Sequence, residues 1–270
     1  MELDRPLTPG DDVILSRLKR LLRPVRPALL PIWRRVRPFV ERSSPSAQQN
    51  TAWLESDRRW KLQPSLRRSP IRPLGKDEFD AVAERFPYYR ARGRYMSVAC
   101  AVAGDLIERH RLSSALELGP HLRSVIVGAD VMDRSAQPDL EAEGRVIVHD
   151  ATSAPWPIAD KQYDLFVGLQ VFEHLKDRQS VAFLEVCRVA RHAIISLPID
   201  WVMDDPSNCH HRISHERALS WFHPVTPTRV ELGNPGPQKR LVYVFENLQG
   251  SPAAPPPSPA TTSTSVVARA

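Results

Sequence analysis

The sequence predicts an α/β fold in which helices cover both faces of a mostly parallel β-sheet. Short, nearly continuous apolar runs recur between positions 115 and 197, and helical or loop segments separate them. Strands of a parallel sheet have this character because both of their faces are buried. Their alternation with helices is typical of a doubly wound sheet. Acidic residues also stand at or near the ends of several of these runs.

The first strong element is a helix that precedes the apolar runs. Its apolar residues follow the 3.6-residue period of an α-helix, and Ser113 and Ser114 interrupt the pattern. The spacing predicts a helix of about four to five turns. The residues that carry the period are Tyr95, Val98, Ala99, Val102, Ala103 and Leu106.

Five apolar runs after this helix are expected to form strands. They lie at positions 115–118, 125–127, 145–150, 163–167 and 192–197. The second strand is expected to end near Asp133, and apolar residues at helical spacing predict a helix before the fifth. Ser214 is expected to cap a short helix that continues through Phe222. The run at 240–245 is typical of a last strand.

Acidic residues mark the ends of neighbouring predicted strands. In a doubly wound sheet, ligands bind outside the carboxyl ends of the strands. Carboxylates there can accept hydrogen bonds from ribose hydroxyls, an adenine amino group or an ammonium group, and they repel phosphate. Each acid alone could instead cap a helix or lie in a solvated loop, but four in register favour a shared binding site. They are Glu117, Asp133, Asp150 and Glu173.

Several segments together resemble a known family. They are ALELGP, GADVMD, VIVHDATSAPWP, YDLFVGLQVFEHL and HAIISLPID. This set, within about positions 94–200, resembles the class I S-adenosylmethionine-dependent methyltransferases that act on small molecules. The most specific part is D-A-x-x-x-P-W-P followed by Y-D-L and E-H-L. The resemblance implies S-adenosylmethionine as cofactor and a Rossmann-like, doubly wound sheet of seven strands whose last strand is antiparallel.

The same resemblance implies positions for the cofactor. Glu117 and Gly119 would border its methionine moiety, and Asp133 would bind the ribose hydroxyls. Asp150 and Ala151 would hold the adenine. We therefore expect these residues to meet at one hollow along the edge of the sheet.

The segment after the first strand departs from the family pattern. Gly119 is followed by Pro120 rather than by further glycines, and Asp133 lies only 16 residues after Glu117. The helix after this strand must therefore be short or absent, and Asp130 becomes a rival to Asp133 for the ribose. A catalytically inactive binding or scaffold protein with this fold is the alternative. A nicotinamide-binding domain is the competing interpretation, and the lack of a G-x-G-x-x-G motif disfavours it.

Catalysis would require mainly the alignment of acceptor, methyl group and sulfur. The resemblance implies that Leu169, just past the fourth strand, lines the pocket floor. An oxygen acceptor must also lose its proton, and His174 is the expected general base; the alternative is a structural histidine at a helix start. No metal is predicted, because Ser214 is expected to begin a helix inside the histidine cluster at 210–215.

The chain is expected to have three parts: a basic, proline-rich arm at 1–73, a methyltransferase domain at 74–250 and a disordered tail at 251–270. Through Arg72 there are 16 basic and 7 acidic residues, so the positive net charge of +6 belongs to the arm. The tail has almost no large apolar residue, and its burial could not offset the entropy lost on ordering.

The arm also contains an amphipathic pattern. Its apolar positions are Ile14, Leu18, Leu21 and Leu22, with basic residues beside them. Such a helix can lie on an anionic membrane surface, which would favour a sugar or lipid-linked glycan as acceptor. An extension without a partner is the alternative. Nucleic acid is not expected, because no recognisable reading module accompanies the basic residues.

The expected location is the cytoplasm, with or without membrane association. Three cysteines without a C-x-x-C pair indicate neither a disulfide framework nor a zinc ribbon. The first residues lack the pattern of a secretory signal. No apolar run reaches the length of about 18 residues that a membrane-spanning helix needs.

Overall fold

The computed structural model describes residues 70–235 and 238–248. The predicted tail and almost all of the predicted arm lie outside the described residues, so their boundaries and roles stay predictions. Among the residues that are described, none of the helices combines the length and apolar character needed to cross a lipid bilayer.

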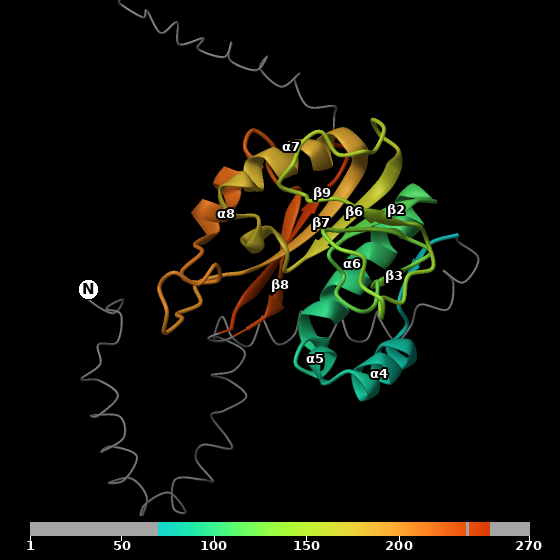
Figure 1. Cartoon of the computed structure of the whole chain (residues 1–270), viewed down its shortest axis with the longest axis horizontal. Helices are drawn as coiled ribbons and strands as arrows, with labels where there is room; N and C mark the ends of the chain where they lie inside the picture. The colour runs from blue at the N-terminus through green and yellow to red at the C-terminus, as the bar shows by residue number, and fades with distance from the viewer. Residues whose placement is uncertain (1–69, 236–237, 249–270) are drawn as a thin grey trace, which may run out of the picture. The chain divides into compact units, whose positions relative to one another are not determined.

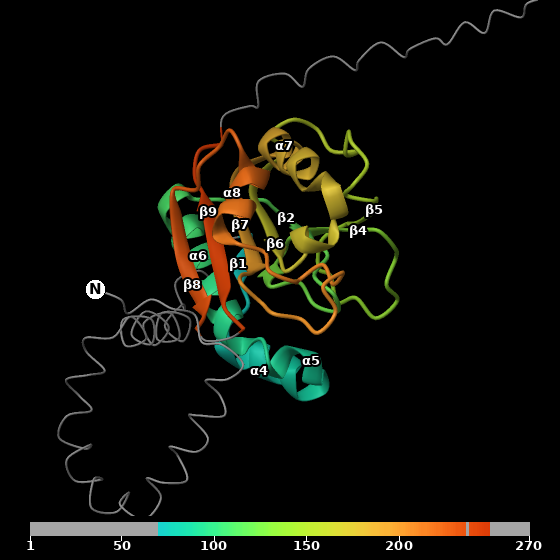
Figure 2. The ribbon, with the colours of Figure 1, turned by 90° about the vertical axis from the view of Figure 1, so that its left-hand side faces the viewer.

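Seven strands form one sheet in the order β5-β4-β2-β6-β7-β9-β8 (Figures 1 and 2). They are β2 (Ala115–Leu118), β4 (Asp130–Asp133), β5 (Val146–Val148), β6 (Tyr163–Leu169), β7 (Ala190–Pro198), β8 (Arg229–Asn234) and β9 (Arg240–Phe245). All neighbours pair in parallel except β9, which is antiparallel to both β7 and β8. This arrangement confirms the predicted Rossmann-like, mostly parallel sheet with an antiparallel last strand.

Helices pack on both faces of the sheet, as predicted (Figures 1 and 2). The helices are α4 (Lys76–Arg85), α5 (Pro87–Arg90), α6 (Gly93–His110), the 3-10 turns η2 (Phe172–His174) and η3 (Lys176–Arg178), α7 (Gln179–Val189) and α8 (His215–Phe222). Side chains alternate between faces along each strand. In β6, Leu165 and Val167 join the apolar cluster under α6, whereas Phe166 joins the cluster under α7 and α8.

Several predicted elements occur at the expected positions. The long helix is α6, and the first and last predicted strands coincide with β2 and β9. The hydroxyl of Ser214 caps α8 by accepting a hydrogen bond from the backbone N–H of Arg217 at 3.1 Å. The residues between β2 and β4 are all described and contain no helix, which confirms the expected shortening.

The strand expected at 125–127 was placed wrongly. Its apolar residues form β3 (Ile126–Val127), which pairs with β1 (Arg72–Pro73) in a separate two-stranded sheet. Gly128, at φ +80°, then turns the chain, and the second strand of the main sheet begins at Asp130. An apolar run identifies a buried strand but not its partner, because pairing depends on segments distant in sequence. The strand β8 was not predicted, since its pattern mixes exposed and half-buried residues.

Candidate functional site

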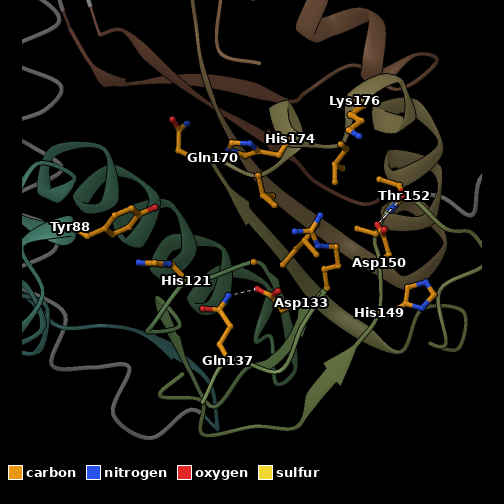
Figure 3. A pocket seen from close by; sticks show the side chains of 16 residues that line it. Tyr88, His121, Asp133, Gln137, His149, Asp150, Thr152, Gln170, His174 and Lys176 are labelled. Atoms are coloured by element: carbon orange, nitrogen blue, oxygen red, sulfur yellow. Dashed lines mark hydrogen bonds between the residues drawn. The ribbon is translucent and has the colours of Figure 1, made fainter. Parts of the chain in front are cut away.

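A cavity of about 530 Å³ lies at the carboxyl ends of β2, β4, β5 and β6 (Figure 3). The chain proceeds from β2 outward to β5 and then returns to the other side of β2 as β6, so the strand order reverses at this point. Connecting loops diverge at such a reversal, which is where open α/β sheets bind ligands. Five of the seven predicted site residues line the cavity: Gly119, Asp133, Asp150, Ala151 and His174.

Two of these residues are carboxylates at adjacent strand ends. Asp133 ends β4 and accepts hydrogen bonds from the Ser135 backbone N–H at 3.1 Å and the Gln137 side chain at 3.0 Å. Asp150 follows β5 and accepts from the backbone N–H of Thr152 at 2.9 Å and its hydroxyl at 2.8 Å. These bonds lower the pKa of Asp150, so it is ionised at neutral pH. The cavity is therefore bordered by acceptors suited to hydroxyl and amino groups.

Asp130 does not share this position. It begins β4, where its Oδ2 is 2.8 Å from Nη2 of Arg145 and accepts a hydrogen bond from the Tyr163 hydroxyl at 2.6 Å. It is not among the residues that line the cavity. Of the two rivals expected for the ribose, Asp133 lines the cavity and Asp130 does not.

Gly119 brings the backbone to the cavity wall directly after β2. Its φ of +58° is a left-handed conformation that side chains disfavour. A Cβ atom there would lie 3.0 Å from Cγ2 of Val171, which also lines the cavity. The lack of a side chain therefore keeps this wall open to a ligand.

Substitution of Gly119 by alanine is expected to destabilise the fold by about 1–2 kcal/mol, because a residue with a side chain is strained at positive φ. It should also weaken ligand binding in the cavity. Gly93→Ala is the matched control, since its Cβ would meet only Phe79, at an ordinary 3.4 Å. Thermal unfolding of the two variants checks this. Equal midpoints would contradict the role given to the Gly119 backbone.

Glu117 is not among the lining residues. Its side chain is 1% exposed, and its Oε2 accepts hydrogen bonds from the Ser124 hydroxyl and from the backbone N–H groups of Val125 at 2.8 Å and Ile126 at 3.3 Å. Burial raises its pKa to about 7. The strand alternation explains the difference from the expectation, since the cavity-lining Leu118 is next to Glu117 and points to the other face. Glu117 anchors the loop beside the cavity.

Leu169 also lies outside the lining set. It shares the face of Leu165 and Val167 in β6 and packs against the cluster under α6. The next two residues, Gln170 and Val171, border the cavity in its place. Here again the two-residue period of the strand determines which side chain reaches the site.

Further lining residues were not predicted from the sequence. Tyr88 and His121 face each other with ring centroids 4.2 Å apart, and Gln137 contacts Asp133. Tyr88 belongs to α5, far from any strand end, so no spacing in the sequence links it to the cavity. Only Gln137, four residues after Asp133, could have been found as a loop residue of that strand end.

His174 and Glu173 lie in η2, just after β6. His174 lines the cavity, and burial lowers its pKa, so the ring is neutral at pH 7. Glu173 is 2% exposed, and neither carboxylate oxygen has a hydrogen-bond partner among the described residues. Burial raises its pKa to about 8. Glu173, like Glu117, is therefore buried behind the cavity wall and does not line the cavity.

No protein-family profile matches the chain, and no curated protein sequence matches it significantly. Solved structures with a similar arrangement include three methyltransferases. A SAM-dependent methyltransferase from Aquifex aeolicus is 13% identical, with a TM-score of 0.35 over 48% of this chain and 80% of that one. The N-methyltransferase NodS from Bradyrhizobium japonicum is 15% identical, with a TM-score of 0.38 over 53% and 97%. A TehB-like SAM-dependent methyltransferase from Corynebacterium glutamicum is 17% identical, with a TM-score of 0.39 over 63% and 97%.

Proposed function

We propose that the chain is an S-adenosylmethionine-dependent methyltransferase that acts on an oxygen atom of a small-molecule acceptor. The observation that carries the proposal is the meeting of Gly119, Asp133 and Asp150 at one cavity where the strand order reverses. At Gly119 the wall of the cavity is bare backbone, and the carboxylates of Asp133 and Asp150 lie beside it. This arrangement suits a nucleoside without phosphate, because carboxylates repel phosphate.

The residues present fit the parts of this cofactor. Asp133 would accept hydrogen bonds from the two ribose hydroxyls, and Asp150 with the backbone of Ala151 would hold the adenine. Gly119 would let the methionine portion approach the backbone. A cavity of about 530 Å³ lies within the usual range of about 300–1,000 Å³ for small-molecule sites.

When bound, S-adenosylmethionine supplies a methyl group already activated on a positively charged sulfur. The chain has then to align the acceptor with that methyl group and to exclude water. We place the acceptor beside His174 and Gln170, because both line the cavity on the β6 side, across from the carboxylates of β4 and β5. In this proposal the acceptor loses its proton at this end of the cavity.

Calorimetry with the full chain tests the proposal. The wild type should bind S-adenosylmethionine, and Asp150→Ala should weaken that binding at least tenfold, since hydrogen bonds to a charged group contribute about 1.5–3 kcal/mol. NAD, which carries a pyrophosphate, should not bind measurably. If neither protein binds S-adenosylmethionine, the non-enzymatic scaffold becomes the better description. A glycan or lipid-linked acceptor remains a proposal tied to the arm.

A further inference from the structure

Three metal-binding side chains meet next to the acceptor end of the cavity. Cys209 and His210 come from the loop between β7 and α8, and His174 comes from η2. The ligand atoms of the three lie within 4.8 Å of one another. We propose that they bind a divalent transition metal, zinc by the chemistry of the donors, and that its fourth position faces the methyl acceptor.

The two distances from the sulfur to the ring nitrogens fit a tetrahedral metal. The Cys209 Sγ atom is 3.3 Å from Nδ1 of His174 and 3.5 Å from Nδ1 of His210. Zinc bonds of about 2.3 Å to sulfur and about 2.0–2.1 Å to nitrogen, at tetrahedral angles, separate the two donors by about 3.5 Å.

Glu173 supplies a second, independent observation. Its side chain is fully buried, and Oε1 lies 3.7 Å from Nε2 of His210, the ring nitrogen opposite the one that faces Cys209. Histidines that bind a metal usually donate their other N–H group to a carboxylate. The buried carboxyl group of Glu173, whose oxygens have no hydrogen-bond partner among the described residues, is therefore placed to accept that N–H group and orient His210 as a ligand.

The hydrogen bond between His210 and Asn208 has to break before His210 can bind the metal. Nδ1 of His210 is 2.8 Å from Oδ1 of Asn208, which also accepts the backbone N–H of His210 at 3.0 Å. On metal binding, His210 would change tautomer, so that Nδ1 binds the metal and the Nε2–H group donates a hydrogen bond to Glu173, and the Cys209 thiol would release its proton to solvent. Oδ1 of Asn208 would keep the backbone N–H of His210 and lose its contact with Nδ1.

A second cluster of similar composition lacks these features. His110, His192 and Glu246 also come within 4.8 Å of one another. Both oxygens of Glu246, however, are already hydrogen-bonded to Arg109, at 3.0 and 3.1 Å, and one of them contacts His110 at 2.8 Å. A neighbouring guanidinium opposes a bound cation. This cluster serves as an internal comparison.

Three protein ligands and an open position are typical of catalytic rather than structural zinc. The role of the metal, unlike its binding, rests on the proposed function. A hydroxyl of the acceptor bound at the open position would lose its proton to solvent more readily. Its oxygen would then form the bond to the methyl carbon while the C–S bond breaks and its electron pair passes to sulfur. His174 would thus act as a metal ligand instead of the general base expected from the sequence.

Titration of the chelator-treated full chain with Co²⁺ tests the site, because cobalt bound to a thiolate gives a near-ultraviolet charge-transfer band. The wild type should bind one equivalent and show the band. Cys209→Ser should abolish the band, and Glu173→Gln should weaken metal affinity about 10- to 100-fold through His210. His110→Ala, in the second cluster, should leave both readouts unchanged. No band in the wild type, or a band that persists in Cys209→Ser, would overturn the site.

The metal result can be separated from the methyltransferase proposal. Calorimetry with S-adenosylmethionine on Cys209→Ser should give wild-type affinity, because Cys209 does not line the cavity. Loss of the cobalt site with intact cofactor binding supports the metal proposal. Cobalt binding by a wild type that does not bind S-adenosylmethionine would refute the proposed function and leave the metal site standing.

Discussion

Asp133→Ala is expected to lower the affinity for S-adenosylmethionine about 100-fold. The carboxylate ends β4 at the cavity and would accept hydrogen bonds from two ribose hydroxyls. A loss of about 3 kcal/mol corresponds to about 100-fold, since hydrogen bonds to charged groups contribute about 1.5–3 kcal/mol each. Asp133→Asn keeps one acceptor oxygen, so its affinity for the cofactor should lie between those of Asp133→Ala and the wild type. Titration calorimetry gives all three affinities.

Asp130→Ala is the matched control in the same strand. Its carboxylate is occupied by Arg145 and Tyr163, away from the cavity. The variant should unfold at a lower temperature and still bind the cofactor with wild-type affinity. If Asp130→Ala loses the cofactor and Asp133→Ala does not, the ribose contact has been assigned to the wrong aspartate.

Glu117→Ala is expected to reduce the free energy of unfolding by about 3–5 kcal/mol. The buried carboxyl accepts three hydrogen bonds from 124–126, and its removal leaves the backbone N–H of Val125 without that partner, whereas the N–H of Ile126 keeps the Ser124 hydroxyl at 3.2 Å. The unsatisfied N–H group costs about 1–3 kcal/mol, and each of the other two lost hydrogen bonds contributes about 0.5–1.5 kcal/mol. Glu117→Gln retains an acceptor oxygen, so its free energy of unfolding should fall much less. Chemical denaturation of both variants at pH 5 distinguishes the two.

The same residue makes stability depend on pH. Burial raises the pKa of Glu117 from an ordinary 4.5 to about 7, so the fold favours the protonated carboxyl. The stabilisation is fully present below pH 4.5 and is lost as pH rises through 7, by up to about 3 kcal/mol. Glu117→Gln should remove this dependence, so its free energy of unfolding should rise relative to that of the wild type between pH 5 and pH 8. Parallel pH profiles of the two proteins would contradict a buried, hydrogen-bonded Glu117.

The elements of the sheet could be predicted because their signals are local. The period of α6, the apolar runs of β2, β6, β7 and β9, and the cap at Ser214 each depend on residues within one element. The mixed pattern of β8 was missed for the same reason, since an edge strand buries only part of one face. Likewise, β3 was assigned to the wrong sheet because its partner β1 lies more than fifty residues earlier.

Taken alone, the sequence determined the layered α/β fold, its strand ends and the acids that follow them, since hydrophobic period and turn residues are properties of short segments. Tertiary structure decided which of those acids meet. Asp133 lines the cavity and Glu117 does not, because their side chains point in different directions from their strands. Tyr88 reaches the cavity only because α5 packs beside the loop after β2. The contact of His174 with Cys209, 35 residues later, forms only when the loop after β7 folds back over the end of β6.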